Sequence, residues 1–126
     1  MYSLLWVAIG GAVGAIVRYY FYKFLPKPMS FPLATFTVNM IASFILGLVL
    51  GMFEYHRGLP SQFKLAIATG FCGALSTFST FVADDYFLLL DGKALMALFY
   101  TVVSVILGIY MVKAGDLTAL YLFGKR

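Results

Sequence analysis

Charged residues are scarce in this sequence. Only 11% of its 126 residues are Asp, Glu, Lys or Arg, whereas soluble domains carry about 25%. The chain is 63% apolar, and its mean hydropathy is +0.96. Too little polar material is present to cover a surface that faces water on all sides. The composition therefore predicts an integral membrane protein and excludes a soluble enzyme.

Histidine and cysteine are almost absent, which limits the chemistry available to the chain. The single histidine, His56, lies in a charged turn, and the single cysteine, Cys72, lies in an apolar stretch where we expect a small buried side chain. The sequence contains neither the Cys/His cluster of a metal site nor a Ser–His pair within reach of each other. The net charge of +4 is scattered, without the basic block that binds nucleic acid. We expect neither an enzyme nor a nucleic-acid-binding protein.

Four apolar runs are long enough to cross a bilayer, since a spanning helix takes roughly 20 residues. The prediction is a single all-α membrane domain over residues 1–126, with spans at about 4–24, 33–53, 62–90 and 94–114. Prolines, glycines and charged residues mark the turns between these spans. A protomer of four helices has a small interior, so we expect a homo-oligomer in the lipid bilayer.

Basic residues are divided almost evenly between the two sides of the predicted membrane. One side holds Arg57, Lys64, Lys113, Lys125 and Arg126, and the other holds Arg18, Lys23, Lys27 and Lys93. An excess of Lys and Arg on one side normally fixes the orientation of a membrane protein. The near balance leaves two interpretations open: one orientation set by other features, or insertion in both orientations with antiparallel pairing of two copies.

The third apolar run is longer than one span needs, and its centre is rich in glycine and hydroxyl residues. Irregular backbone at membrane depth is tolerated only where it is buried in protein or lines a cavity. We predict a break near 73–77, between Gly73 and Ser76. Backbone carbonyls freed by such a break can bind a cation, as in the broken helices of transporters.

Two phenylalanines follow the predicted break. Phe78 and Phe81 are three residues apart and share a helix face. Such residues are commonly core or lipid-facing, but here they adjoin the break, and the rim of a phenyl ring carries partial positive charge. Asp84 and Asp85 lie about 12 Å from the centre of the span, where they would anchor the helix at the interface or filter ions at a pore mouth. A route without a deep carboxylate suits a small anion better than a cation.

Polar residues also recur at helical spacing in the other spans. Thr35, Asn39, Ser43, Gly47 and Gly51 fall on one face of the second span, and Tyr100, Ser104 and Gly108 form a similar stripe in the fourth. An unpaired amide in hydrocarbon is costly, so Asn39 either bonds a neighbouring helix or donates into an aqueous pathway. A mid-span tyrosine likewise needs a partner for its hydroxyl. Arg18 either snorkels to the interface, holds a neighbouring carbonyl or attracts an anion.

Three stretches resemble the Fluc (CrcB) fluoride channel family: Gly10–Tyr19, Asn39–Gly47 and, most specifically, Gly70–Phe81. The resemblance covers the whole chain, including its length and its four spans. It implies an antiparallel, dual-topology homodimer with two pores in the bacterial inner membrane. It also implies passive export of fluoride down its electrochemical gradient, which lowers fluoride toxicity in the cytoplasm.

The same resemblance implies roles for individual residues. Phe78 and Phe81 would be the pore phenylalanines, and Asn39 the pore amide. The polar lining would comprise Ser79, Thr80, Tyr100 and Ser104. The backbone carbonyls of Gly73 and Ser76, from both subunits, would bind a structural sodium ion at the dimer centre. Arg18 matches an arginine near the end of the family's first helix.

The sequence departs from the family at two positions, and two other functions remain open. Ala74 stands where many members have a second glycine, and Ser76 stands where threonine is common, although carbonyl ligation does not need a particular side chain. A small dual-topology exporter coupled to protons would need a titratable group on its path, for which only Asp84 and Asp85 are available. The third reading is a membrane assembly subunit that transports nothing.

Overall fold

The computed structural model describes residues 2–27 and 31–124, and its regular structure is helical throughout these residues. Its elements are α1 (Tyr2–Phe24), α2 (Leu33–Tyr55), α3 (Ser61–Lys64), the π-helical stretch η1 (Leu65–Cys72), α4 (Gly73–Leu75), α5 (Phe78–Leu90) and α6 (Ala94–Phe123). The segment from α3 to α5 forms one interrupted span. The described residues therefore contain four helical segments long and apolar enough to cross a membrane, which confirms the predicted all-α membrane fold.

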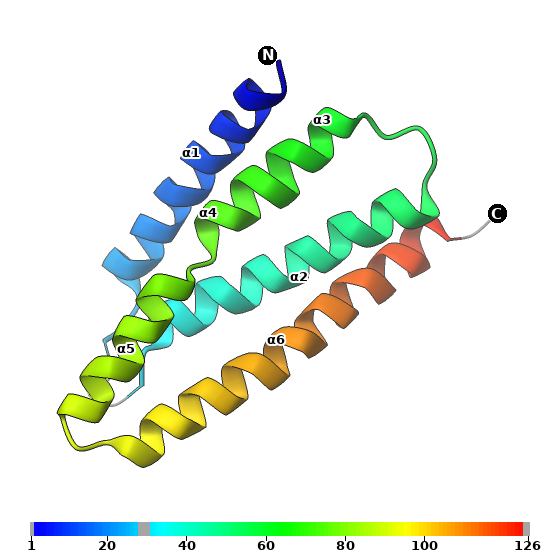
Figure 1. Cartoon of the computed structure of the whole chain (residues 1–126). Helices are drawn as coiled ribbons and strands as arrows, with labels where there is room; N and C mark the ends of the chain where they lie inside the picture. Colours follow the sequence, from blue (N-terminus) through cyan, green and yellow to red (C-terminus); the bar gives the residue numbers. More distant parts are fainter. Residues whose placement is uncertain (1, 28–30, 125–126) are drawn as a thin grey trace.

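The helices form two pairs that each run in parallel (Figure 1). α1 lies against η1 and α4, and α2 lies against α6 over most of its length. The N-terminus, the turn after α2 and the end of α6 lie at one end of the molecule, and the turn between α5 and α6 lies at the other. Part of the predicted loop between the first two spans, residues 28–30, and the basic residues Lys125 and Arg126 lie outside the described residues.

Glycines bring α2 and α6 into backbone contact. A Cβ atom on Gly47 would collide with the carbonyl oxygen of Val112, and one on Gly115 would collide with the carbonyl oxygen of Phe44. In a bilayer the hydrophobic effect does not drive helices together. Helices associate there through van der Waals contacts, and small residues increase these contacts because they let the backbones approach closely. Gly47 and Gly51, the glycine half of the stripe on α2, thus serve helix packing. The polar half of that stripe is free for another role.

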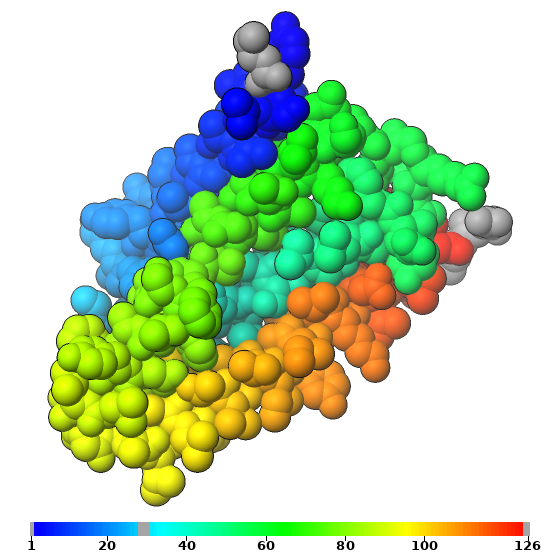
Figure 2. All heavy atoms as spheres, viewed as in Figure 1, coloured from blue at the N-terminus to red at the C-terminus, as the bar shows by residue number. Residues whose placement is uncertain are grey.

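The interior is small, and the outward faces are apolar. One cluster of Val38, Ala42 and Leu75 packs α2 against α4, and a second of Leu88, Ala97 and Tyr100 packs α5 against α6. Large side chains such as Leu95, Ile109 and Tyr121 point outward. In the space-filling view the four segments form a single slab, with α5 and the start of α6 together at one corner (Figure 2). Outward apolar faces of this kind suit contact with lipid.

The last helix is longer than the predicted span. α6 continues to Phe123, and its 30 residues would extend about 45 Å, against a hydrocarbon core of roughly 30 Å. The helix continues past the acidic residue Asp116, which lies beside Gly51 of α2. The apolar run predicts which part of a helix crosses the membrane, but it does not predict where the helix ends.

Gly47→Ala should destabilise the protein because the new methyl group meets backbone that cannot move away. Overpacking of this kind costs about 1–3 kcal/mol. Gly108→Ala is the matched control, since its Cβ would meet only side-chain atoms, at 3.7 Å from Met40 and 3.9 Å from Ser43. The effect is measured by heating each variant in detergent and recording how much monodisperse protein remains. Equal stability of the two variants would contradict the packing account.

Candidate functional site

The third span is interrupted at two residues. Ser76 has φ −74° and ψ 157°, and Thr77 has φ −152° and ψ 122°, so both are extended between the helical α4 and α5. Gly73 itself remains helical, with φ −63° and ψ −32°. The predicted break is confirmed, and it falls at Ser76 and Thr77, at the far end of the predicted interval. A glycine is therefore not what opens the helix.

The side chain of Asn39 supports the interruption from α2. Its Oδ1 accepts the backbone N–H of Thr77 at 2.8 Å, and its Nδ2 donates to the carbonyl of Thr77 at 3.4 Å. The side-chain amide thereby supplies the acceptor that the N–H of Thr77 loses and adds a donor to the Thr77 carbonyl, which meets the condition for irregular backbone inside a membrane. Of the two roles considered for Asn39, bonding to a neighbouring helix is directly visible. The side-chain amide of Asn39 has a second N–H, which remains available for the other role, donation into an aqueous pathway.

Thr77 also starts the helix that follows. Its Oγ1 accepts the backbone N–H of Thr80 at 3.2 Å, the usual N-cap arrangement, and its hydroxyl donates to Thr80 Oγ1 at 3.2 Å. Thr77 is 8% exposed, so these bonds lie inside the protein. Thr77 is not among the residues to which the sequence patterns assign a role. A threonine directly before a renewed helical run was the available signal.

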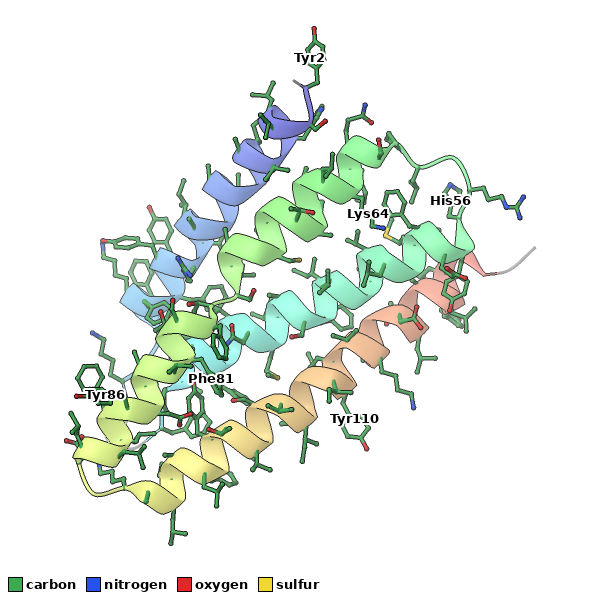
Figure 3. All side chains as sticks on the ribbon, in the orientation of Figure 1. Tyr2, His56, Lys64, Phe81, Tyr86 and Tyr110 are labelled. Atoms are coloured by element: carbon green, nitrogen blue, oxygen red, sulfur yellow. The ribbon has the colours of Figure 1, made fainter. Side chains whose placement is uncertain are left out.

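A groove of about 270 Å³ lies beside the break. Four of the predicted pore residues, Asn39, Phe78, Phe81 and Ser104, line it. The other lining residues are Met40, Ser43, Ser76, Thr77 and Val105. Phe81 projects from α5 toward α2 and α6, whereas Tyr86 on the same helix points outward (Figure 3). Residues from three spans thus meet at one polar groove.

The two rings and one hydroxyl give this groove its chemical character. The rings of Phe78 and Phe81 have centroids 6.3 Å apart, and Phe78 is 77% exposed in the single chain. The Ser104 hydroxyl is buried and has no hydrogen-bond partner among the described residues. The lining thus combines hydroxyl and amide groups with two phenyl rings, and it includes no carboxylate.

The other predicted polar residues lie outside the groove. Ser79 is exposed at the start of α5, 3.4 Å from the Thr77 hydroxyl, and Thr80 is bonded to Thr77. Tyr100 is completely buried, and its ring packs against Phe81 with centroids 4.9 Å apart. The Tyr100 hydroxyl donates to Asp84 Oδ2 at 3.2 Å, which supplies the partner that a mid-span tyrosine needs. Tyr100 therefore lies behind Phe81 as seen from the groove.

The two adjacent carboxylates turn inward. Asp84 receives the hydroxyl of Tyr100, and Asp85 receives the hydroxyl of Thr101. The second oxygen of Asp85 is buried without a partner among the described residues. These contacts differ from the interfacial anchoring considered from the sequence. The depth of a residue in a span can be counted along the sequence. Which side of the helix faces α6 depends on packing, so the sequence alone does not show it.

A hydroxyl pair between α1 and α2 was not foreseen. Tyr22 Oη lies 2.5 Å from Thr35 Oγ1, and Thr35 is 1% exposed. Tyr22 lies near the end of α1, and Thr35 is the first member of the stripe on α2. Arg18, one turn before Tyr22, is partly exposed and forms no ion pair among the described residues.

The break leaves the carbonyls around it without their usual helical donors, and those of Gly73 and Ser76 are among them. The N–H of Thr77 goes to Asn39 and not to the Gly73 carbonyl, and the N–H of Thr80 goes to Thr77 Oγ1 and not to the Ser76 carbonyl. Gly73 and Ser76 border a small cavity of about 140 Å³ with Ser43 and the buried Cys72. Clusters of His, Cys, Asp or Glu that could hold a metal are absent from the described residues. Backbone oxygens are therefore the candidate cation ligands here.

This arrangement defines a class of protein: small helical membrane proteins in which a broken span borders a polar groove. Residues 5–116 match the family described as CrcB-like protein, Camphor Resistance (CrcB), and the chain belongs to this family. It is 60% identical over 116 residues, 92% of this chain and 94% of the relative, to a protein of Ignicoccus hospitalis named "Fluoride-specific ion channel FluC". Proteins of the same name from Pyrococcus abyssi and Methanocaldococcus jannaschii are 43% and 40% identical, over 93% and 96% of this chain and 95% and 97% of those relatives.

Asn39→Ala should weaken the fold at the break, because it leaves the buried N–H of Thr77 unpaired. A buried polar group without its partner costs about 1–3 kcal/mol. Ser43→Ala, one turn away on the same face, is the control, since the Ser43 hydroxyl only donates to the Asn39 carbonyl of its own helix. Amide hydrogen exchange at Thr77 should accelerate in the first variant alone. Unchanged protection of that amide would refute the pairing.

Proposed function

We propose that this chain is a fluoride-selective ion channel through which fluoride crosses the cell membrane passively. Its named relatives are fluoride-specific channels, and they match nearly the whole chain. The observation that carries the proposal is the meeting of Asn39, Phe78, Phe81 and Ser104 at one groove beside the break. Ion channels are not enzymes, and flow down the electrochemical gradient needs no energy source in the protein.

Selection of fluoride would rest on donors that replace its water. A conducting site must compensate the lost hydration shell and still bind weakly enough to release the ion. The free N–H of Asn39, the unpartnered Ser104 hydroxyl and the edges of Phe78 and Phe81 are such donors. All are neutral, which limits how tightly an anion is held. The proton-coupled exporter is not favoured, since the groove lining includes no carboxylate.

The functional unit we propose is an antiparallel homodimer. Phe78 is a large apolar residue exposed beside a polar groove, and a second copy would cover it. The nearly equal number of basic residues on the two sides permits insertion in both orientations. A two-fold axis would give two equivalent grooves and hence two pores.

Sodium is the cation we propose for the carbonyls of Gly73 and Ser76. The helical donors of both carbonyls are directed elsewhere, so the oxygens fit a hard cation that takes oxygen ligands. When bound between two copies, the ion would supply positive charge that neutralises the facing carbonyl dipoles. Replacing all sodium by N-methylglucamine should then lower the fraction of dimer in detergent. A dimer fraction independent of sodium would exclude this role.

Phe81→Ile and Phe78→Ile should each lower fluoride efflux from liposomes at least about tenfold, the effect of ~1.4 kcal/mol on a barrier. The aliphatic side chain keeps most of the volume but removes the ring edge. Phe87→Ile is the matched control, because Phe87 lies on the same helix and is 61% exposed. A fluoride electrode reads the efflux, with chloride efflux measured in parallel. Wild-type rates in both groove variants, or equal passage of chloride, would defeat the proposal.

A further inference from the structure

A polar hollow lies where α2 and α6 end, and it shares no residue with the groove beside the break. Its volume is about 620 Å³. The lining residues are Glu54, Tyr55, Arg57 and Gly124. His56 marks this end of the molecule in Figure 3, and its ring packs against that of Phe123 on α6, with centroids 5.6 Å apart. An acidic, an aromatic and a basic side chain thus border one cavity.

The two charges at the polar hollow have opposite signs and do not neutralise each other directly. Glu54 and Arg57 are three residues apart and exposed, and neither forms an ion pair with any residue that the structure describes. A ligand that enters the hollow therefore meets a carboxylate and a guanidinium together. A zwitterion with an ammonium and an anionic group complements this pair, whereas a simple anion or cation would also meet a like charge.

Deeper in the span, an apolar groove follows the contact between α2 and α6 and is called the seam groove below. Its volume is about 540 Å³. The lining residues are Gly47, Leu50, Ile109, Val112, Lys113 and Asp116. Gly47, Leu50 and Glu54 follow one another at three and four residues, so one side of α2 leads from the seam groove to the polar hollow. The Tyr55 hydroxyl of the hollow interacts with Asp116 of the groove, so the two spaces adjoin.

The two spaces lie at different depths in a bilayer. α2 and α6 have 23 and 30 residues, or about 35 and 45 Å, against a hydrocarbon core of roughly 30 Å. The ends of both helices therefore reach the lipid headgroups, and the polar hollow lies among them. Leu50 is about one turn deeper than Glu54, and Gly47 about two turns deeper, so the seam groove lies among the acyl chains.

We propose that the polar hollow and the seam groove together bind one phospholipid whose headgroup carries a phosphate and a primary amine. The planar guanidinium of Arg57 donates two parallel hydrogen bonds to the phosphate, and the Glu54 carboxylate accepts from the ammonium. One acyl chain lies in the seam groove against Leu50, Ile109 and Val112. A choline headgroup has no N–H to donate to Glu54, so it binds less tightly. The inference is independent of the proposed function, because no residue of the fluoride groove takes part.

Native mass spectrometry tests the headgroup site, with equal amounts of phosphatidylethanolamine, phosphatidylcholine and phosphatidylglycerol added to the protein in detergent. The wild-type protein should retain phosphatidylethanolamine in preference to the other two lipids. Arg57→Gln should lower this retention at least about tenfold, the weight of one hydrogen bond to a charged group. Lys64→Gln is the matched control, since Lys64 is a cation at the same end that does not line the hollow. Glu54→Gln should abolish the preference over phosphatidylcholine.

A second pair of variants tests the acyl-chain site. Ile109→Trp fills the seam groove and should lower the retention of phosphatidylethanolamine. Ile106→Trp is the control, because Ile106 lies on the same helix, is 48% exposed and does not line the groove. Free O-phosphoethanolamine at the same concentration should not displace the lipid, because it lacks the acyl chains.

Four outcomes would overturn the inference. They are equal retention of the three lipids by the wild-type protein, a loss in Arg57→Gln that Lys64→Gln shares, and displacement of the lipid by free O-phosphoethanolamine. The fourth is a lower dimer fraction in Ile109→Trp with an unchanged lipid count, which would show that a second copy of the chain occupies the seam groove. Size-exclusion profiles of all variants show that each protein is folded.

Discussion

Interrupting a helix inside a membrane strands peptide groups where hydrocarbon offers them no partner, and the rest of this structure depends on how that demand is met. Asn39 bonds the N–H and the C=O of Thr77, and Thr77 then caps α5. The cap fixes where α5 begins and so places Phe78 beside the groove. Because those donors are directed elsewhere, the carbonyls of Gly73 and Ser76 lose their helical partners. One amide thus determines the position of the rings and of the candidate cation ligands.

The helix that carries Asn39, α2, is also held closely against α6. Gly47 and Gly115 let the two backbones touch, which leaves little freedom to slide or rotate. This contact brings Ser104 to the groove that Asn39 borders. The stripe on α2 is therefore divided: its glycines fix the helix pair, and its amide supports the break. Helix packing and support of the break are done by different residues on the same helix face.

The number of spans and the break followed from the sequence because both reflect simple rules, namely span length and the rarity of glycine and hydroxyl clusters in lipid. Four of the residues that line the groove, Asn39, Phe78, Phe81 and Ser104, were named through the family resemblance. Thr77, Tyr22 and the inward turn of Asp84 were not. Each depends on how one helix is rotated against another, and periodicity marks a face without saying which neighbour it meets. A hydroxyl pair such as Tyr22 and Thr35 needs the rotation of α1 and α2 together.

The interruption is not placed midway along its neighbours. Asn39 lies about two turns after the start of α2 at Leu33 and about four turns before its end at Tyr55. One protomer therefore offers a shallow approach from one face of the membrane and a deep one from the other. With two oppositely inserted copies, each face of the membrane would have one shallow approach and one deep approach. Their summed current would be the same for inward and outward flow, so such an assembly has no built-in rectification.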